Sequence, residues 1–311
     1  MTAGRVGVVL NPVARRAGPA LARLGAACRE RGREIIDVLT TTVAEPGGPQ
    51  AARLLAAGAD RVVVLGGDGT VREVAEVLAG SGATLGIVPL GTANLVARNL
   101  GLSLGDGPAP VATALGGEIR DVDVGRVAYE QLGPAGTVRS PERVFLVVVG
   151  LGYDGEAVAR TGPRLKRVAG WTSYIVVGAR HLASRGHRLT LQVDGGAPRE
   201  LRAWTVLVGV AGRIPLGIDL FPEAAPDDGR LHVMTVTPGT PLHWVPIALK
   251  GILHRPGSVP GLGYEAATRA RVAAGAPLTA QLDGDPHPDV LALDVRVEPG
   301  ALRVAAPRPR S

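Results

Sequence analysis

Along the first 120 residues, short apolar runs rich in valine, isoleucine and leucine alternate with longer segments of helical composition. Runs of the first kind predict buried strands, and the segments between them predict helices. The expected strands cover residues 6–10, 34–39, 61–65 and 85–88, and the expected helices cover residues 20–31, 50–57 and 71–78. This alternation predicts a doubly wound α/β domain with a parallel sheet, in which ligands bind at the carboxyl ends of the strands.

From residue 121 onward the pattern changes to short β-like runs separated by turn residues. The runs 122–127, 144–149, 189–193, 203–210, 231–236, 278–282 and 293–297 predict strands, and helices are expected at 165–182 and 242–253. This pattern indicates an antiparallel β-sandwich, with a long hairpin loop over the Gly/Pro-rich stretch 129–141. We therefore predict an α/β domain over 1–120 and a β-sandwich domain over 121–298. For the C-terminal segment 299–311, a return to the first domain is left open.

Composition narrows the class of protein. The 311 residues are 46% hydrophobic, and the longest apolar stretch is far shorter than the roughly 18 residues of a membrane-spanning helix. The single cysteine, Cys28, cannot form an intrachain disulfide, and no Cys/His cluster has the spacing of a zinc site. The N-terminal residues lack a signal-peptide core. We therefore expect a cytoplasmic protein.

The net charge of +6 is typical of proteins that meet nucleic acid or an anionic membrane surface. Aromatic stacking platforms and nucleic-acid-binding modules are lacking, so no nucleic acid is expected as a partner. Arginine-rich clusters at 160–167 and 180–188 flank Trp171 and Tyr174. They are either solvated faces or a contact with anionic lipid, and peripheral membrane association is the preferred hypothesis.

The strongest local motif is Gly66-Gly67-Asp68-Gly69-Thr70, which directly follows the third predicted strand and opens a helix. Glycines let the backbone approach a ligand closely, and a helix N-terminus offers free N–H groups to phosphate. Thr70 adds a hydroxyl, and Asp68 adds an acceptor for a ribose, a metal or water. A tight turn capped by Thr70 is the alternative, but one glycine would suffice for it. The motif therefore predicts a phosphate site, and the missing Walker pattern excludes a P-loop NTPase.

The other predicted strands are also followed by turn residues with hydroxyl or amide side chains. The fourth strand is followed by Pro89-Leu90-Gly91-Thr92-Ala93-Asn94 and then by a helix through Ala97 and Arg98. Asn11-Pro12 ends the first strand, and Thr40-Thr41-Thr42 ends the second. Because parallel strands end at one edge of a sheet, these loops are expected to converge in a nucleotide site.

Together, Asn11-Pro12, GGDGT at 66–70 and PLGTAN at 89–94 resemble the catalytic domain of the diacylglycerol kinase and sphingosine kinase family, particularly its bacterial lipid kinases. GLGYD at 150–154, DDG at 227–229 and LDGD at 282–285 follow in the family's order, so the resemblance covers nearly the whole chain. GGDGT alone also occurs in NAD kinases. PLGTAN followed by the late Asp-Gly-acidic motif is what separates the lipid kinases from them.

The resemblance implies a lipid kinase that uses ATP and Mg²⁺ to phosphorylate the hydroxyl of a membrane lipid, with diacylglycerol as the expected acceptor. It implies an ATP site between the two domains, with contacts from Asn11, Pro12, Val13, Ala14, Arg15, Thr42, Gly66, Gly67, Asp68, Gly69, Thr70, Val71, Arg72, Glu73, Thr92 and Asn94. Asp228, with the backbone carbonyls of Ala225 and Arg230, would hold Mg²⁺. Asp68 and Asp285 would be catalytic, Asp285 standing where the family places a proton-accepting glutamate. Asp283 is counted among the cofactor-binding residues, and we expect it to orient Asp285 or a metal-bound water. Residues two apart share one face of a regular strand, although a turn at Gly284 would separate them.

Three positions depart from the family pattern. Glycine follows Asn11-Pro12 only at Gly18, Leu95 stands where the family often has aspartate, and the carboxylate of Asp285 is one methylene shorter than that of glutamate. The altered first loop and the shorter Asp285 keep a catalytically degenerate nucleotide- or lipid-binding regulator as an alternative, and the shared GGDGT loop keeps an NAD kinase-like enzyme as another. A homodimer is left open.

Residues 150–155 match the dinucleotide fingerprint G-x-G-x-x-G. They lack the acidic residue expected about 20 positions later, and they begin no βαβ unit. We therefore interpret them as a turn near Asp154 and not as an NAD(P) site.

Overall fold

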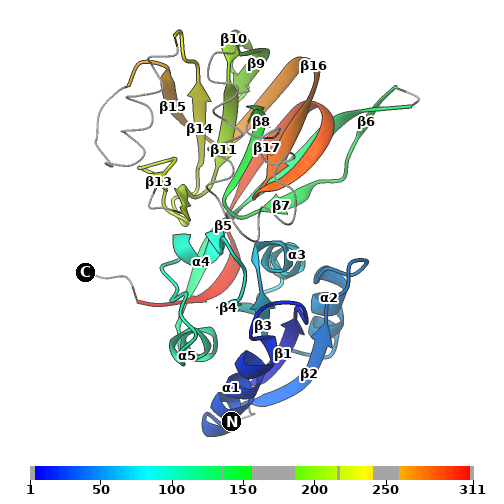
Figure 1. Ribbon diagram of the computed structural model, residues 1–311, viewed down its shortest axis with the longest axis vertical. Helices are drawn as coiled ribbons and strands as arrows, with labels where there is room; N and C mark the ends of the chain where they lie inside the picture. The colour runs from blue at the N-terminus through cyan, green and yellow to red at the C-terminus, as the bar shows by residue number, and fades with distance from the viewer. Residues whose placement is uncertain are drawn as a thin grey trace. The chain divides into compact units, whose positions relative to one another are not determined.

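The computed structural model describes residues 4–134, 136–153, 155, 186–215, 218–240 and 259–308 (Figure 1). The chain forms two compact units: unit 1 comprises Met1–Val124 and Gly300–Ser311, and unit 2 comprises Gly125–Pro299. Two long strands, β5 (Glu118–Gly133) and β17 (Asp285–Ala306), contribute residues to both units. The helices expected at 165–182 and 242–253, Asp154, and the arginine-rich clusters except Gly186, His187 and Arg188 lie outside the described residues.

Unit 1 contains a parallel sheet in the order β2 (Glu34–Thr40), β1 (Arg5–Leu10), β3 (Arg61–Gly66) and β4 (Thr84–Pro89). The last part of β17 joins this sheet beside β4 through Arg303 and Val304. Strands β3 and β4 are buried along their whole length, as expected for valine- and leucine-rich strands covered on both faces. All four strands predicted in this region are confirmed to within one residue at each end.

Helices cover both faces of this sheet. Helix α1 (Ala17–Glu30) packs against α5 (Ala109–Gly116), and α2 (Gly48–Ala56) packs against α3 (Asp68–Leu78) on the other side (Figure 1). A short helix, α4 (Leu95–Asn99), follows β4 after a turn. Helix α5 was not predicted from the sequence. Its apolar residues Val111, Ala114 and Leu115 complete the core on the α1 side.

Unit 2 is built from antiparallel strands. One run of neighbours is β15 (Leu262–Ala267), β14 (Leu231–Val236), β11 (Thr205–Gly209), β8 (Val148–Gly152) and β16 (Arg269–Leu282). Strand β16 also pairs with β17 and with β9 (His187–Val193), and β9 pairs with β10 (Arg199–Ala203). Strand β5 pairs with β6 (Gly136–Arg139) and β7 (Arg143–Phe145), and β12 (Arg213–Ile214) pairs with β13 (Ile218–Asp219).

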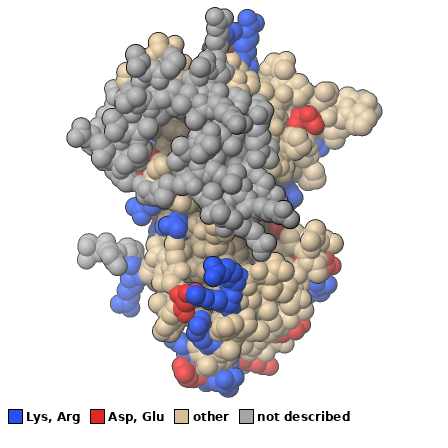
Figure 2. All heavy atoms as spheres, viewed as in Figure 1, with Lys and Arg blue, Asp and Glu red and all other residues tan. Residues whose placement is uncertain are grey.

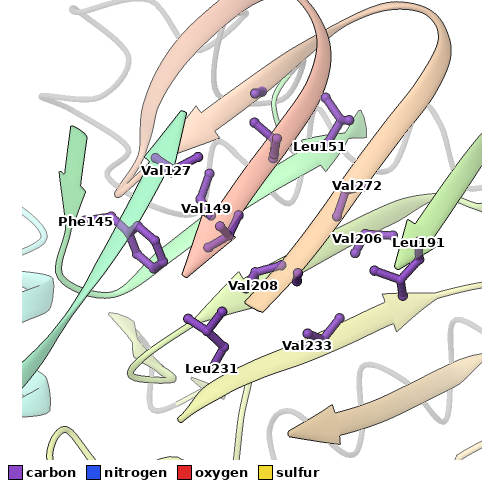
Figure 3. Close-up of a cluster of buried hydrophobic side chains, with 14 of the residues drawn as sticks. Val127, Phe145, Val149, Leu151, Leu191, Val206, Val208, Leu231, Val233 and Val272 are labelled. Atoms are coloured by element: carbon purple, nitrogen blue, oxygen red, sulfur yellow. The ribbon is translucent and has the colours of Figure 1, made fainter. Parts of the chain in front are cut away.

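The core of unit 2 is formed mainly by aliphatic side chains from these strands, with Phe145 at one side of the group drawn in Figure 3. Val149, Val208, Val233 and Leu231 come from three neighbouring strands and are almost completely buried. The predicted fold class, a parallel-sheet α/β domain followed by a β-rich domain, is confirmed.

Three details of unit 2 differ from the expectation. The stretch 129–141 is a paired hairpin of β5 and β6 and not only a loop. The single strand expected at 144–149 is interrupted, because β7 ends at Phe145 and β8 begins at Val148. Strands β10 and β15 were not predicted. Their partly exposed, polar sequences lack the apolar run of a buried strand.

Candidate functional site

The strand order of unit 1 changes direction between β1 and β3, which makes the carboxyl ends of these strands the topological switch point. The backbone amide of Asn11 donates to the carbonyl of Leu65 at 3.0 Å, and the amide of Thr41 donates to the carbonyl of Leu10 at 2.9 Å. The ends of β1, β2 and β3 are thus tied together by main-chain hydrogen bonds. The expected convergence of these loops is present within unit 1.

The glycine loops after β3 and β4 lie in direct contact. A Cβ atom on Gly91 would lie 2.7 Å from the Cα of Gly67, and one on Gly67 would lie 3.2 Å from the Cα of Gly91. A Cβ atom on Gly66 would crowd Thr70, whereas one on Gly69 would meet no atom within 4 Å. Gly67 and Gly91 therefore allow the two loops to pack closely. Gly69 is the glycine whose Cα faces open space, where a ligand could approach the backbone.

Asp68 and Asn94 connect these loops internally. Asp68 Oδ1 accepts a hydrogen bond from the amide of Val96, at the start of α4, at 3.3 Å. The side-chain amide of Asn94 bonds both the N–H and the carbonyl of Gly91 at 2.9 Å. Asn94 adopts a φ of 48°, in the left-handed region that asparagine tolerates. Its side chain is therefore committed to the turn, which leaves Gly91 and Thr92 exposed.

The loop after β1 presents backbone and charge to solvent. Asn11 Oδ1 accepts a hydrogen bond from the amide of Val13 at 3.2 Å, which forms an Asx turn. Pro12, Val13 and Arg15 are exposed, and Ala14 is half-buried. Arg15 is consequently an exposed basic residue in the loop at the switch-point edge.

Other predicted ATP contacts are less open. Val71 and Arg72 are buried in the first turns of α3, and Glu73 Oε1 lies 3.7 Å from Arg72. Thr70 is also buried and is not the cap of α3, whose N-cap residue is Gly67. The Thr42 hydroxyl accepts a hydrogen bond from the amide of Glu45 at 3.0 Å. It therefore stabilises its own turn.

Unit 2 carries Asp228 in the turn before β14. Asp228 Oδ2 accepts the amide N–H of Ala225 at 3.0 Å, and Oδ1 accepts that of Arg230 at 2.9 Å. His232 Nε2 lies 2.8 Å from the same Oδ2. Ala225 and Arg230 thus contact Asp228 through their amides, and the Ala225 carbonyl also accepts the Asp228 amide at 3.3 Å. In this geometry Asp228, the expected Mg²⁺ ligand, stabilises its own turn through these hydrogen bonds.

Asp283 is buried, with 7% of its surface exposed, and its carboxylate is occupied by backbone. Oδ2 accepts the amide of Leu146 at 2.9 Å, and Oδ1 accepts those of Val147 and Val148 at 3.0 and 2.9 Å. Asp283 and Gly284 have φ values of 47° and 86°, as a two-residue type I′ hairpin turn between β16 and β17 requires.

Of the two arrangements left open for Asp283 and Asp285, the structure has the turn at Gly284, which separates the two side chains. Asp285 begins β17, pairs with Leu282 and is half-exposed. It is the carboxylate of the late motif that reaches solvent.

Asp285 and Asp228 lie at the same edge of the unit 2 sheet. Leu282, Val149, Val208 and Val233 form one row across β16, β8, β11 and β14. The turn at Asp283 follows Leu282 at the β16 end of this row. His232, the partner of Asp228, lies one position beyond Val233 at the β14 end, on the same side of the row as the Asp283 turn. Three strand spacings of about 4.8 Å place the two acidic turns roughly 14 Å apart along this edge.

His232 is a residue that the sequence reasoning missed, because the histidines have no metal-site spacing. Its signal was the Asp-x-x-x-His sequence from Asp228 into an apolar strand. Among the residues that the structure describes, no three His, Cys, Asp or Glu side chains gather as a metal site.

The G-x-G-x-x-G match has a packing explanation. Strand β8 is antiparallel to both of its neighbours, so it begins no βαβ unit. A Cβ atom on Gly152 would lie 2.6 Å from the carbonyl of Trp204, and one on Gly155 would lie 1.9 Å from that of Thr279. These glycines permit close approach of neighbouring backbone.

Comparison with known proteins identifies two matched regions. Residues 5–127 match the family model of the diacylglycerol kinase catalytic domain, and residues 147–306 match that of the YegS C-terminal NAD kinase beta sandwich-like domain. A protein of Pseudomonas aeruginosa strain PAO1, described as "Probable lipid kinase YegS-like", is 34% identical over 296 residues, which cover 91% of this chain and 88% of that protein.

Two solved structures share the fold. A diacylglycerol kinase from Bacillus anthracis str. Sterne has a TM-score of 0.69 at 19% identity, over 99% of this chain and 98% of that chain. Yeast NADH kinase complexed with NADH has a TM-score of 0.51 at 11% identity, over 98% of this chain and 84% of that chain.

Proposed function

Because the chain belongs to the diacylglycerol kinase catalytic-domain family and carries a YegS-type C-terminal domain, we propose that it is an ATP- and Mg²⁺-dependent lipid kinase. It transfers the γ-phosphoryl group of ATP to a hydroxyl of a membrane lipid, with diacylglycerol as the first expected acceptor and phosphatidic acid as the product. The family predicted from the motifs is thereby confirmed. The identity of the acceptor lipid is part of the proposal.

Membership of a kinase family implies ATP as the phosphoryl donor. The open glycine turn after β3 is the observation that supports a phosphate site in unit 1 most strongly, because Gly69 is exposed and a Cβ atom on it would meet no atom within 4 Å. Gly69 and Thr92 then offer exposed backbone beside the N-terminus of the 11-residue helix α3. Arg15 adds a positive charge at the same edge of the sheet.

Asp228 fits Mg²⁺ only as one ligand among several. An ionised carboxylate has about four lone-pair directions, and the polypeptide and His232 use three of them. Magnesium commonly binds through one or two carboxylates together with substrate phosphates and water. A bound Mg²⁺ would neutralise charge on the transferring phosphoryl group. In this proposal Asp228 supplies one oxygen, and ATP and water supply the rest.

Asp285 is the candidate proton acceptor. Phosphoryl transfer depends chiefly on positioning and charge neutralisation, and a carboxylate accepts the proton of the attacking hydroxyl. Asp285 is half-exposed, and the preceding turn is fixed by the three amides bound to Asp283. The acceptor hydroxyl would meet a carboxylate whose backbone is held in place.

The acceptor lipid places the enzyme at a membrane surface. No helix in the described ranges is long and apolar enough to cross a bilayer. With a net charge of +6, we propose peripheral contact with anionic lipid on the cytoplasmic side. Exposed charges are screened over about 8–10 Å at physiological ionic strength, so this contact should weaken with added salt.

The test is ADP release from Mg·ATP with mixed micelles that contain diacylglycerol, a sphingoid base or no acceptor, and with NAD in solution. We expect release that depends on diacylglycerol and is lost in Asp285→Asn. Release with NAD alone would instead support the NAD kinase-like alternative. ATP binding without turnover on any acceptor would support a non-catalytic regulator.

A further inference from the structure

Strand β6 and the end of β5 form a hairpin that extends away from the other strands of unit 2 (Figure 1). Its register pairs Gln131 with Val138 and Leu132 with Thr137. Leu132 is 53% exposed and Val138 is 58% exposed. These are two of the most exposed large aliphatic side chains in the described part of unit 2. Single exposed aliphatics need no explanation, but two at the end of one projecting element do.

The two aliphatic side chains lie on opposite faces of the hairpin. Residues directly paired across antiparallel strands project to the same face, and successive residues alternate. Leu132 therefore shares a face with Thr137, and Val138 shares the other face with Gln131. A flat protein partner would cover one face and leave the other in water. A lipid bilayer into which the hairpin end is inserted would cover both faces.

The charge pattern of the hairpin fits a lipid surface. Within residues 130–139 the charged residues are Glu130 and Arg139, which pair across the base of the hairpin, so the end beyond them carries no charged residue. Figure 2 shows the end of the hairpin, at the right of unit 2, in tan, the colour of residues other than Lys, Arg, Asp and Glu. Only the inward-facing backbone groups of the hairpin end are paired, between β5 and β6. Its outer edges need water or headgroup partners, so the contact that the backbone allows is shallow and lies at headgroup depth.

The hairpin is anchored beside the proposed proton acceptor. Gln131 Nε2 donates a hydrogen bond to the carbonyl of Pro288 at 3.0 Å, and the Tyr129 ring stacks on His287 with centroids 4.8 Å apart. Pro288 lies three residues after Asp285 on β17, about 10 Å along an extended strand. A bilayer that surrounds the hairpin end would therefore present its headgroup region near Asp285.

We propose that the β5–β6 hairpin, residues 130–139, is a membrane-contact element that inserts Leu132 and Val138 shallowly into the bilayer beside Asp285. The choice of lipid as partner rests on the proposed lipid kinase function. The insertion itself is a binding property that can be measured without turnover.

The first test is flotation of the full chain with vesicles of 70% phosphatidylcholine and 30% phosphatidylglycerol. The double variant Leu132→Asp/Val138→Asp should bind these vesicles at least tenfold more weakly than the unchanged chain. Tenfold corresponds to about 1.4 kcal/mol. Ile119→Asp is the matched control, since Ile119 is a 44%-exposed aliphatic residue at the other end of β5. Equal binding by the double variant and the control would overturn the proposal, as would an unchanged chain that binds no vesicles.

A second measurement covers the case in which the double variant fails to fold. Thr137→Cys, labelled with an environment-sensitive fluorophore, places a probe at the exposed hairpin end, and the one native cysteine, Cys28, is buried. The emission should shift to shorter wavelength when vesicles are added. An unchanged spectrum with vesicle-bound protein would show that another element makes the contact.

Activity separates this proposal from the proposed function. With a water-soluble short-chain diacylglycerol, kcat should be nearly equal in the unchanged chain and in the double variant, whereas kcat/KM on vesicle lipid should fall about tenfold in the variant. If the unchanged chain phosphorylates no lipid but still inserts the hairpin, the proposed function fails and the membrane contact stands.

Discussion

Asp283 Oδ1 accepts a hydrogen bond from the backbone amide of Val147 at 3.0 Å, across 136 positions of sequence. The same carboxylate binds the amides of Leu146 and Val148, so it closes the gap between β7 and β8. Without this carboxylate, buried N–H groups at the strand break would lack these acceptors. The late Asp-Gly-Asp motif therefore combines a structural residue, Asp283, with a solvent-reaching one, Asp285.

Asp283→Ala should destabilise unit 2 strongly. Each buried donor that loses its partner costs about 1–3 kcal/mol, so we expect a loss of several kcal/mol in the free energy of unfolding. Asp283 also holds a φ of 47°, which alanine tolerates less well than aspartate. Thermal or urea unfolding measures the loss. Stability equal to that of the unchanged chain would show that these hydrogen bonds contribute little.

Asp285→Asn should lower kcat by about 10²–10⁴-fold, the usual cost of removing a general base, with little change in melting temperature. Asp285→Glu should retain activity, because it restores the family's longer side chain. Steady-state kinetics on micellar diacylglycerol provide the measurement. If Asp285→Asn keeps full kcat, the proton acceptor lies elsewhere.

Asp68→Ala should abolish detectable turnover and cost about 1 kcal/mol of stability, because Asp68 accepts the N–H of Val96 at the start of α4. Asp68→Asn keeps a side-chain acceptor and removes the charge, so it should stay closer to the unchanged chain in stability and still be inactive. Comparing both variants by calorimetry and ADP release separates the structural part from the catalytic part. A fully active Asp68→Asn would argue against a charge-dependent role.

Asp228→Ala should raise the Mg²⁺ concentration needed for half-maximal activity, and it should also lower the melting temperature because three hydrogen bonds are lost. Asp227→Ala, in the same turn, is the matched control. A titration with MgCl₂ at saturating ATP measures the requirement. An unchanged titration together with lower stability would assign Asp228 to the turn alone.

Stability should fall in acid partly through Asp294. Burial alone would raise the pKa of Asp294, but hydrogen bonds from Arg271 and Arg139 outweigh it and hold the pKa below its ordinary value. A depressed folded-state pKa contributes stability above the unfolded pKa of about 3.9, and this contribution is lost as pH falls through the folded pKa. Asp294→Asn should cost about 1 kcal/mol at pH 7. It should also lose less stability than the unchanged chain between pH 7 and pH 3, as urea unfolding can show.

Much of unit 1 could be predicted from sequence because its signals are local. Buried parallel strands such as 61–66 are continuous apolar runs, and the glycine loop at 66–70 follows directly. The carboxyl ends of parallel strands must meet at one edge, so the site loops could be placed together before any contact was known. Helix α5 was missed, because its position is decided by packing against α1 and β4.

The sequence by itself determined the family, the order of strands and helices in unit 1, and the residues at its strand ends. These features could be predicted because hydrophobic periodicity and glycine motifs depend only on residues that are close together in the sequence. The tertiary structure alone decided what those residues contact. It assigned Gly67 and Gly91 to loop packing, turned Asp283 inward and left Asp285 half-exposed. Residues 144–149 look like one strand in sequence, yet they break at Leu146 because a carboxylate from a distant hairpin competes for their amides. Such a choice depends on a contact between distant positions, which no local pattern encodes.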